Sequence, residues 1–432
     1  MKRKLEQDLQ LWKQKKDRKP LILNGARQVG KTYILQKFGD RYYKNTVYVN
    51  LEINEAVASF FTENITPEKI IRYLEAATGE RIIPEETLII LDEVQVCERA
   101  LTSLKYFYEE TPEYHIIAAG SLLGVAIHRS RYSFPVGKVE TMTLYPLDFE
   151  EFLWAMDEEL LCGEIRECYS KMDPLVEALH QQAIERYRQY LIIGGMPACI
   201  NCFLGTGKLL DVPAVQNEIL NNYLADMSKY AENTSGVRIR ACFNSLPAQL
   251  AKDNKKFQYK IVQKGGTATV FGEAIEWLKS AGVVVKCQKT EQGNEPIAAY
   301  SDLSSFKLYM GDVGLLVMKS GILQQTILTG TGNTFLGAVT ENYVATQLTA
   351  KGFDLFYWES EHSAELDFVT YDQSGRYAIE VKKGENIKSR SLNLFTKKYE
   401  PENIYCFSLK NFGYENDIHS VPLYAVFCLE KK

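Results

Sequence analysis

A glycine-rich segment that follows a short apolar run constrains this chain more than any other feature. Residues 21–23 read Leu-Ile-Leu, typical of a buried strand, and lead directly into the pattern G-x-x-x-x-G-K-T. Glycines at these positions let the backbone wrap around phosphate oxygens, and N–H groups of the loop and the next helix point at the anion. The pattern therefore predicts a nucleotide phosphate site. It comprises Gly25, Ala26, Arg27, Gln28, Val29, Gly30, Lys31 and Thr32.

The last two residues of this loop have predicted roles in holding ATP and Mg²⁺. Lys31 would neutralise the β- and γ-phosphates, and Thr32 would bind Mg²⁺ through its hydroxyl. A carboxylate partner is required, and residues 88–93 supply one: four apolar residues are followed by Asp92 and Glu93. At the end of a buried parallel strand, Asp92 is expected to hold Mg²⁺, while Glu93 polarises the attacking water as a general base.

A third apolar run, residues 115–119, ends at Gly120 and Ser121. Ser121 is expected near the γ-phosphate, where it would sense that group during catalysis. The other interpretation, a serine in a turn, accounts for the same residue by turn preference alone.

The order of these motifs resembles that of the AAA-type P-loop ATPases. The segments GARQVGKT, AAGSLLG, FPVGKVETMTLYPLDFEEFL and LIIGGMPACI together resemble a bacterial and archaeal family of AAA-like ATPases with a C-terminal domain of unknown function. The resemblance extends from about residue 19 to residue 383 and beyond. Members usually have Gly-Arg where this chain has Gly137-Lys138, and a lysine cannot offer the planar fork of an arginine. Arg129 and Arg131 are nearby candidates for an arginine finger.

The overall composition describes an ordinary globular protein. Fifty Lys and Arg against 55 Asp and Glu give a net charge of −5, and 46% of the residues are hydrophobic, which excludes a disordered chain. We expect a cytoplasmic protein without a membrane span, because no apolar stretch is long enough and the N-terminus does not resemble a signal peptide. The nine cysteines are expected to be buried apolar residues; Cys199 and Cys202 lack the second ligand pair of a zinc site.

Charge is segregated along the chain, which the total conceals. Residues 148–164 are acidic and predict an acidic surface, whereas residues 236–265 carry seven basic residues and one acidic residue. In residues 236–285, two helical patterns followed by a strand pair are typical of a winged helix. The basic residues there would suit contacts with DNA phosphates. A packing module with a solvated basic face explains them equally well.

The last hundred residues contain a second set of carboxylates. Asp367 lies in one strand-like segment, and Glu380 and Lys382 lie on one face of the next, after a turn. This D…E-x-K order resembles the restriction-endonuclease-like nuclease superfamily, which implies that Asp367 and Glu380 chelate Mg²⁺ while Lys382 orients the attacking water. In that superfamily a helix-borne glutamate, here Glu341, often completes the site. The alternative is charge alternation on an exposed strand.

Together these features predict an α/β multidomain protein. We expect an AAA-type P-loop ATPase domain with a parallel sheet over residues 1–147 and a helical lid over 148–235. A winged-helix-like module over 236–315 and a restriction-endonuclease-like α/β domain over 316–432 would follow. The predicted function is an ATP-driven switch acting with nucleic acid, with Mg²⁺-dependent DNA cleavage as an extension. The alternative is a signalling or scaffold ATPase whose C-terminal domain binds a protein partner. Self-association fits both.

Overall fold

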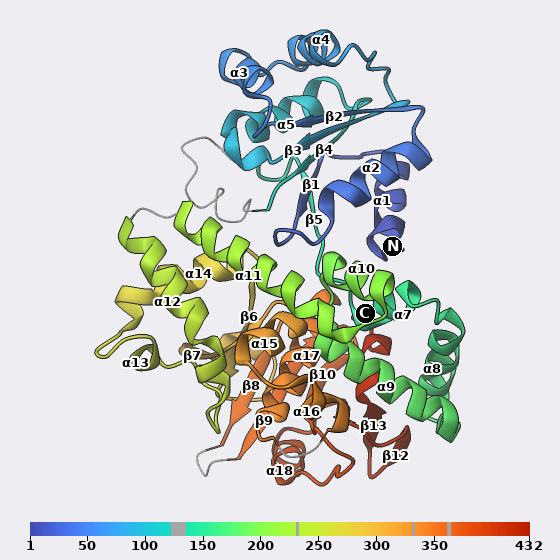
Figure 1. The fold of residues 1–432 in the computed structure, drawn as a ribbon, viewed down its shortest axis with the longest axis vertical. Coiled ribbons are helices and arrows are strands. Elements are labelled where there is room, and N and C mark those ends of the chain that lie inside the picture. The colour runs from blue at the N-terminus through green and yellow to red at the C-terminus, as the bar shows by residue number, and fades with distance from the viewer. Residues whose placement is uncertain (122–134, 230–232, 331–332, 361–363) are drawn as a thin grey trace. The chain divides into compact units, whose positions relative to one another are not determined.

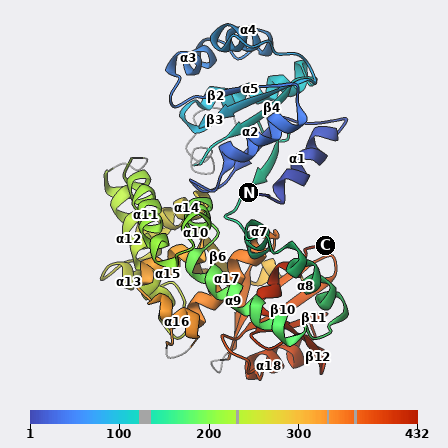
Figure 2. The same ribbon diagram turned by 45° about the vertical axis from the view of Figure 1, so that its right-hand side comes forward.

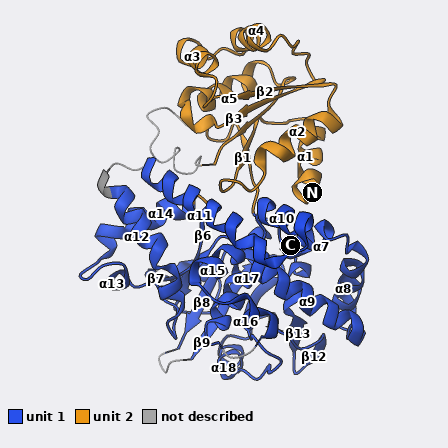
Figure 3. Ribbon diagram, in the orientation of Figure 1, with its two compact units in different colours: residues 1, 146–279, 283–432 blue, residues 2–145, 280–282 orange. Residues whose placement is uncertain are grey.

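The computed structural model describes residues 1–121, 135–229, 233–330, 333–360 and 364–432 (Figure 1). The chain divides into two compact units (Figure 3). The N-terminal unit comprises residues 2–145 and 280–282; the C-terminal unit comprises residue 1, residues 146–279 and residues 283–432. The segments expected to form the lid, the winged helix and the nuclease-like domain thus share almost entirely one compact unit. Arg129 and Arg131 lie outside the described residues.

A five-stranded parallel sheet forms the centre of the N-terminal unit. Its strands lie in the order β2-β3-β4-β1-β5, so the chain crosses over between non-adjacent strands. The apolar runs of the three central strands, β1, β3 and β4, are typical of strands covered on both faces. The strands are β1 (Leu21–Asn24), β2 (Asn45–Asn50), β3 (Thr87–Asp92), β4 (His115–Ala119) and β5 (Glu140–Thr143).

Helices cover this sheet on both sides. One face packs on α3 (Glu55–Glu63), α4 (Pro67–Thr78) and α5 (Glu98–Glu110), with a core that includes Ile22, Ile89 and Phe61. On the other face lies α2 (Lys31–Tyr42), with α1 (Leu5–Gln14) beside it in both views (Figures 1 and 2). A short 3-10 turn, Val94–Val96, follows β3.

The C-terminal unit is built on an eight-stranded mixed sheet in the order β12-β13-β11-β10-β9-β8-β6-β7. Strands β6 and β7, expected as a wing, pair with each other and then join this sheet through β8, so they do not form a separate hairpin. The strands are β6 (Val284–Thr290), β7 (Ser301–Met310), β8 (Phe356–Glu359), β9 (Glu365–Asp372), β10 (Gly375–Val381), β11 (Asn403–Ser408), β12 (Gly413–Glu415) and β13 (Ile418–Pro422).

The helices of this unit precede the sheet or connect its strands. Helix α18 (Arg390–Tyr399) packs Leu392, Phe395 and Tyr399 against Trp358 and neighbouring apolar residues of the sheet. The others are α7 (Phe149–Ala155), α8 (Glu159–Lys171), α9 (Glu177–Ile193), α10 (Pro197–Thr206), α11 (Val212–Lys229), α12 (Asn233–Leu250), α13 (Tyr259–Val262), α14 (Ala268–Ser280), α15 (Val313–Ser320), α16 (Gln324–Thr329) and α17 (Leu336–Ala350). Short 3-10 turns cover Leu209–Asp211, Ile297–Tyr300 and Leu423–Cys428.

The acidic segment 148–164 is only partly a surface, which corrects the expectation from its charge. Asp148, Glu150 and Glu151 are buried at the start of α7. Asp148 accepts a hydrogen bond from the backbone N–H of Glu151 at 2.9 Å and caps the helix, and Arg166 binds both carboxylate oxygens of Glu150 at 2.6 and 2.7 Å. The helix-capping hydrogen bond and the ion pair offset the free-energy cost of burying these acids.

The turn between α9 and α10 explains why two glycines stand together at 194–195. Gly194 has φ 77°, and a Cβ there would lie 2.3 Å from Oδ1 of Asp312. The N–H of Gly195 donates to Oδ2 of Asp312 at 2.6 Å, and the same carboxylate caps α15 through the N–H of Leu315. Asp312 therefore ties the turn to a helix that begins more than a hundred residues later.

Seven of the nine cysteines are buried, and all nine are free thiols. No helix in the described part of the chain is both long and apolar enough to cross a membrane.

Candidate functional site

The predicted nucleotide residues meet at one edge of the parallel sheet. Strands β1, β3 and β4 run in the same direction, and their carboxyl ends carry the glycine-rich loop, Asp92 and Ser121. The N–H of Gly120 donates to the carbonyl of Leu23 at 3.4 Å, which joins the end of β4 to the base of the loop. Ligands of open α/β sheets bind at this edge.

The glycine-rich loop folds tightly against β5. A Cβ on Gly25, which has φ 150°, would lie 2.3 Å from the carbonyl oxygen of Leu144, so no larger residue fits there. Lys31 begins α2 and turns back over the loop, where its Nζ donates to the carbonyls of Gly25 and Ala26 at 2.9 Å each. Burial lowers the pKa of Lys31 to about 8. The ammonium is thus held inside the concave loop where an anion would bind.

Thr32 and Asp92 form the group predicted to hold Mg²⁺. The Thr32 hydroxyl donates to Oδ2 of Asp92 at 2.6 Å, and Tyr48 donates to the same oxygen at 2.9 Å. Mg²⁺ takes oxygen ligands at about 2.0–2.1 Å with near-octahedral angles, so neighbouring ligand oxygens lie roughly 3 Å apart. The two side chains therefore suit a shared cation.

Glu93 and Ser121 flank this pair. Glu93 adopts a left-handed backbone conformation, φ 51°, and its Oε2 accepts a hydrogen bond from Gln95 at 2.5 Å. The side chain is half-buried and directly follows Asp92. Ser121 is buried one residue beyond the end of β4.

Arg3 is a residue of this site that the sequence analysis missed. Its side chain is buried, and Nη1 donates to the carbonyl of Val29 in the loop at 3.0 Å, while Nη2 donates to the carbonyl of Tyr145 at 2.5 Å. The only signal in the sequence is the basic character of residues 1–20, which does not single out one arginine.

Lys138 lies at the amino ends of the strands, whereas the loop lies at their carboxyl ends. It precedes β5, whose first residue Glu140 pairs with Leu21 at the start of β1. Its Nζ forms an ion pair with Glu109 at 3.0 Å. Lys138 therefore does not contact a nucleotide bound at the loop of its own chain.

The second constellation comes together in the C-terminal unit. Lys382 binds Oε1 of Glu380, and the N–H of Val381 donates to Oδ2 of Asp367 at 2.8 Å. Glu380 is 4% exposed, and its second oxygen, Oε2, is buried without a hydrogen-bond partner among the residues that the structure describes. A buried acceptor without a hydrogen bond lowers the stability of the folded chain unless a water molecule or a cation interacts with it.

Glu341 lies in α17 and is held by residues from other elements. Lys255, from the turn after α12, contacts Oε2 of Glu341; Lys307, from β7, donates to Oε1 at 2.9 Å. Tyr309 also donates to Oε1. Lys307 is fully buried and forms a second ion pair with Glu365 at 2.5 Å. The D…E-x-K pattern contains neither lysine.

The pKa shifts follow from this crowding. Burial, and then the carboxylates of Glu341 and Glu380, hold the pKa of Asp367 well above its usual range. Burial also raises the pKa of Glu341, but Lys255 and Lys307 outweigh that effect and lower it to about 2. Within the described ranges, no three His, Cys, Asp or Glu side chains gather in a geometry that could hold a metal. A cation bound at this site would have two carboxylate ligands, Asp367 and Glu380.

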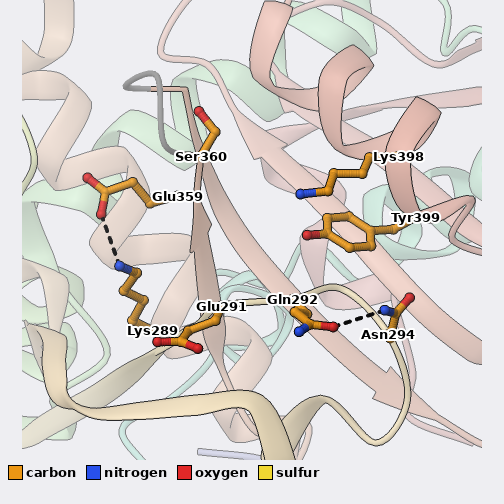
Figure 4. Close-up of a pocket in the computed structure, with 8 residues that line it drawn as sticks. All are labelled: Lys289, Glu291, Gln292, Asn294, Glu359, Ser360, Lys398 and Tyr399. Atoms are coloured by element: carbon orange, nitrogen blue, oxygen red, sulfur yellow. Dashed lines mark hydrogen bonds and ion pairs between the residues drawn. The ribbon is translucent and has the colours of Figure 1, made fainter.

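A polar cavity of about 620 Å³ lies in the same unit (Figure 4). Lys289 pairs with Glu359 at 3.5 Å across it, and Gln292 receives a hydrogen bond from Asn294 at 3.1 Å. Figure 4 shows the side chains of Lys398 and Tyr399 extending from α18 toward the opposite wall. The lining residues are Lys289, Glu291, Gln292, Asn294, Glu359, Ser360, Lys398 and Tyr399.

Comparison with protein families identifies the N-terminal part. Residues 17–153 match the family described as AAA domain. The matched segment contains the parallel sheet and the glycine-rich loop of the N-terminal unit. The prediction of a nucleotide-binding ATPase domain is thereby confirmed. Residues 184–326 match a domain of unknown function (DUF8612), and residues 336–426 match another (DUF4143).

Several solved structures resemble the chain at low identity. The Walker-type ATPase PABY2304 of Pyrococcus abyssi is 16% identical, with 73% of this chain and 94% of that chain covered and a TM-score of 0.45. The ORC2 protein of Aeropyrum pernix, in ADPNP and ADP complexes, is 11% identical over 76% and 89%, with a TM-score of 0.32. The ORC1 protein of Aeropyrum pernix in complex with DNA is 12% identical over 73% and 90%, with a TM-score of 0.27. No curated protein matches the chain.

Proposed function

We propose that the ATPase domain hydrolyses ATP with Mg²⁺ and that its nucleotide state controls how the rest of the chain binds nucleic acid. The observation that carries the catalytic part is the hydrogen bond between Thr32 and Asp92, with Glu93 directly after it. Thr32 and Asp92 would hold Mg²⁺, which supplies charge neutralisation at the phosphates. Lys31 would bind the β- and γ-phosphates, Glu93 would accept a proton from water, and Ser121 would contact the γ-phosphate.

The nucleic-acid part rests on exposed charge in the C-terminal unit. Lys388, Arg390, Lys397 and Lys398 are exposed, and none forms an ion pair with another described residue. The basic segment 236–265 gives weaker support, because Lys255 and Lys256 are used internally, by Glu341 and Glu359. Uncompensated cations of this kind favour a phosphate backbone.

The test measures ATP turnover and the binding of labelled DNA by fluorescence anisotropy, without nucleotide, with ADP and with a non-hydrolysable ATP analogue. We expect Lys31→Ala to abolish turnover and to remove any difference in DNA affinity between nucleotide states. Lys37→Ala, six residues along the same helix in a lysine that pairs with Glu6, is the matched control. Full turnover by Lys31→Ala would contradict the ATPase assignment. Absence of DNA binding at low salt in every state would exclude the nucleic-acid part and favour a protein partner.

A second candidate activity is cleavage of a phosphodiester by the C-terminal unit. The orphaned Oε2 of Glu380 beside Asp367 favours it, because a divalent cation would satisfy that buried oxygen. Asp367 and Glu380 would hold Mg²⁺, which polarises a phosphate and activates water when bound. Lys382, already bound to Glu380, would orient the water. Plasmid cleavage that requires Mg²⁺ and is lost in Asp367→Ala tests this candidate; equal cleavage by wild type and variant would refute it.

A further inference from the structure

Two lysines in the nuclease-like site have no counterpart in its sequence pattern, and they decide which carboxylates are free. We propose that Lys307 and Lys255 are the counter-ions of Glu341, Lys307 fixed and Lys255 movable, so that a divalent cation is held by Asp367 and Glu380 without Glu341. We propose further that Lys255 weakens the binding of that cation. The inference rests on the cleavage candidate above, because it concerns the same cation position.

Lys307 is the fixed member of the pair. Its ammonium has no contact with solvent and lies between Glu341 at 2.9 Å and Glu365 at 2.5 Å. It also lies 5.0 Å from the ring centroid of Tyr357. A fully buried ammonium cannot exchange its carboxylate partners for water, so its two ion pairs persist in the folded chain.

Lys255 is the movable member. It belongs to the short turn after α12, and its side chain remains 20% exposed while Nζ contacts Oε2 of Glu341. Oε1 is taken by Lys307 and Tyr309. Both oxygens of Glu341 are therefore engaged by cationic or hydroxyl donors, which makes this carboxylate a poorer cation ligand than Glu380.

Glu380 shows the opposite situation. One of its oxygens binds Lys382, and the other is buried with no hydrogen-bond partner in the described part of the chain. Asp367 lies close enough to interact electrostatically with Glu380 and with Lys255. A cation could therefore bind the free oxygen of Glu380. The positive charge of the Lys255 ammonium would repel a cation bound there.

Binding of Mn²⁺ to the full chain, without nucleotide and followed by the electron paramagnetic resonance of free Mn²⁺, tests this proposal without any measurement of cleavage. Titration of Glu380→Gln defines the background, including binding at the ATPase domain. We expect Glu341→Gln to leave the Glu380-dependent affinity within threefold of wild type. We expect Lys255→Met to bind at least tenfold more tightly. Lys256→Met is the matched control, because Lys256 pairs with Glu359, and we expect no change.

Each outcome is decisive. Glu341→Gln that weakens Mn²⁺ binding as much as Glu380→Gln would make Glu341 a ligand and overturn the proposal. Equal affinity of wild type and Lys255→Met would also overturn it, while leaving the cleavage candidate intact. If no variant shows Glu380-dependent binding, both the proposal and the cleavage candidate fail, whereas the ATPase assignment is unaffected. Should Glu341→Gln not fold, Lys255→Met/Glu341→Gln replaces it, since that variant removes one charge of each sign.

Discussion

Thr32 and Asp92, which lie 60 positions apart in the sequence, share a hydrogen bond of 2.6 Å at the edge of the parallel sheet. The contact joins the glycine-rich loop after β1 to the end of β3, although β4 lies between these strands. Hydroxyl and carboxylate are the oxygen ligands expected for Mg²⁺ beside a triphosphate. In the proposed function this pair would hold the cation, and Glu93, the residue after Asp92, would act on the attacking water.

Glu93→Gln is expected to separate binding from hydrolysis. The amide keeps the size of the side chain but cannot accept a proton from water, so we expect ATP turnover to fall by a factor of about 100 or more. Nucleotide affinity, measured by titration calorimetry, should change by less than about threefold, since only the proton acceptor is lost. Glu110→Gln, at the exposed end of α5, is the control. Turnover near that of wild type would assign the general base elsewhere.

Arg3→Ala is expected to weaken nucleotide binding indirectly, through the loop that Arg3 holds in place. Loss of the hydrogen bonds to the carbonyls of Val29 and Tyr145 removes a tether between the loop and the end of the sheet. A charged hydrogen bond contributes about 1.5–3 kcal/mol, so we expect affinity to fall about tenfold or more. Lys16→Ala, an exposed change in the same segment, should have no effect. Equal affinity of the two variants would show that Arg3 does not position the loop.

Gly194→Ala is expected to destabilise the C-terminal unit. The new Cβ would lie 2.3 Å from Asp312, and the backbone is in the left-handed region, so we expect a loss of about 3 kcal/mol in the free energy of unfolding. Gly205→Ala provides the contrast: it lies in α10 with open space around it, and we expect a gain of about 0.5–1 kcal/mol. Urea denaturation measures both. Similar stability of the two variants would refute the steric argument.

Asp312 is expected to make stability depend on pH. Burial raises its pKa to about 6, against the hydrogen bonds from Leu315, Gly195 and Gly314 that lower it. The folded chain then binds a proton more tightly than the unfolded chain. The free energy of unfolding contributed by Asp312 should therefore fall as pH rises from about 4 to about 6.

The size of this effect is on the order of 2–3 kcal/mol, since one pKa unit corresponds to about 1.4 kcal/mol. The groups that face Asp312, namely Tyr190, Cys199 and Tyr223, stay neutral over this range because their own pKa values are raised. Comparing wild type with Asp312→Asn by urea denaturation between pH 4 and 6.5 isolates the contribution. A pH-independent difference between the two proteins would contradict it.

The sequence by itself determined the glycine-rich loop, the strand that ends in Asp92 and Glu93, and the order of strands and helix that carries Glu341, Asp367, Glu380 and Lys382. These features are local: an apolar run or a glycine spacing specifies the backbone within a few residues. Only the tertiary structure brought Arg3 to the loop, buried Glu150 under Arg166, joined β6 and β7 to the large sheet and placed Lys255 and Lys307 on Glu341. Those contacts join residues far apart in the chain, and a buried charge is stable only beside the partner that packing supplies.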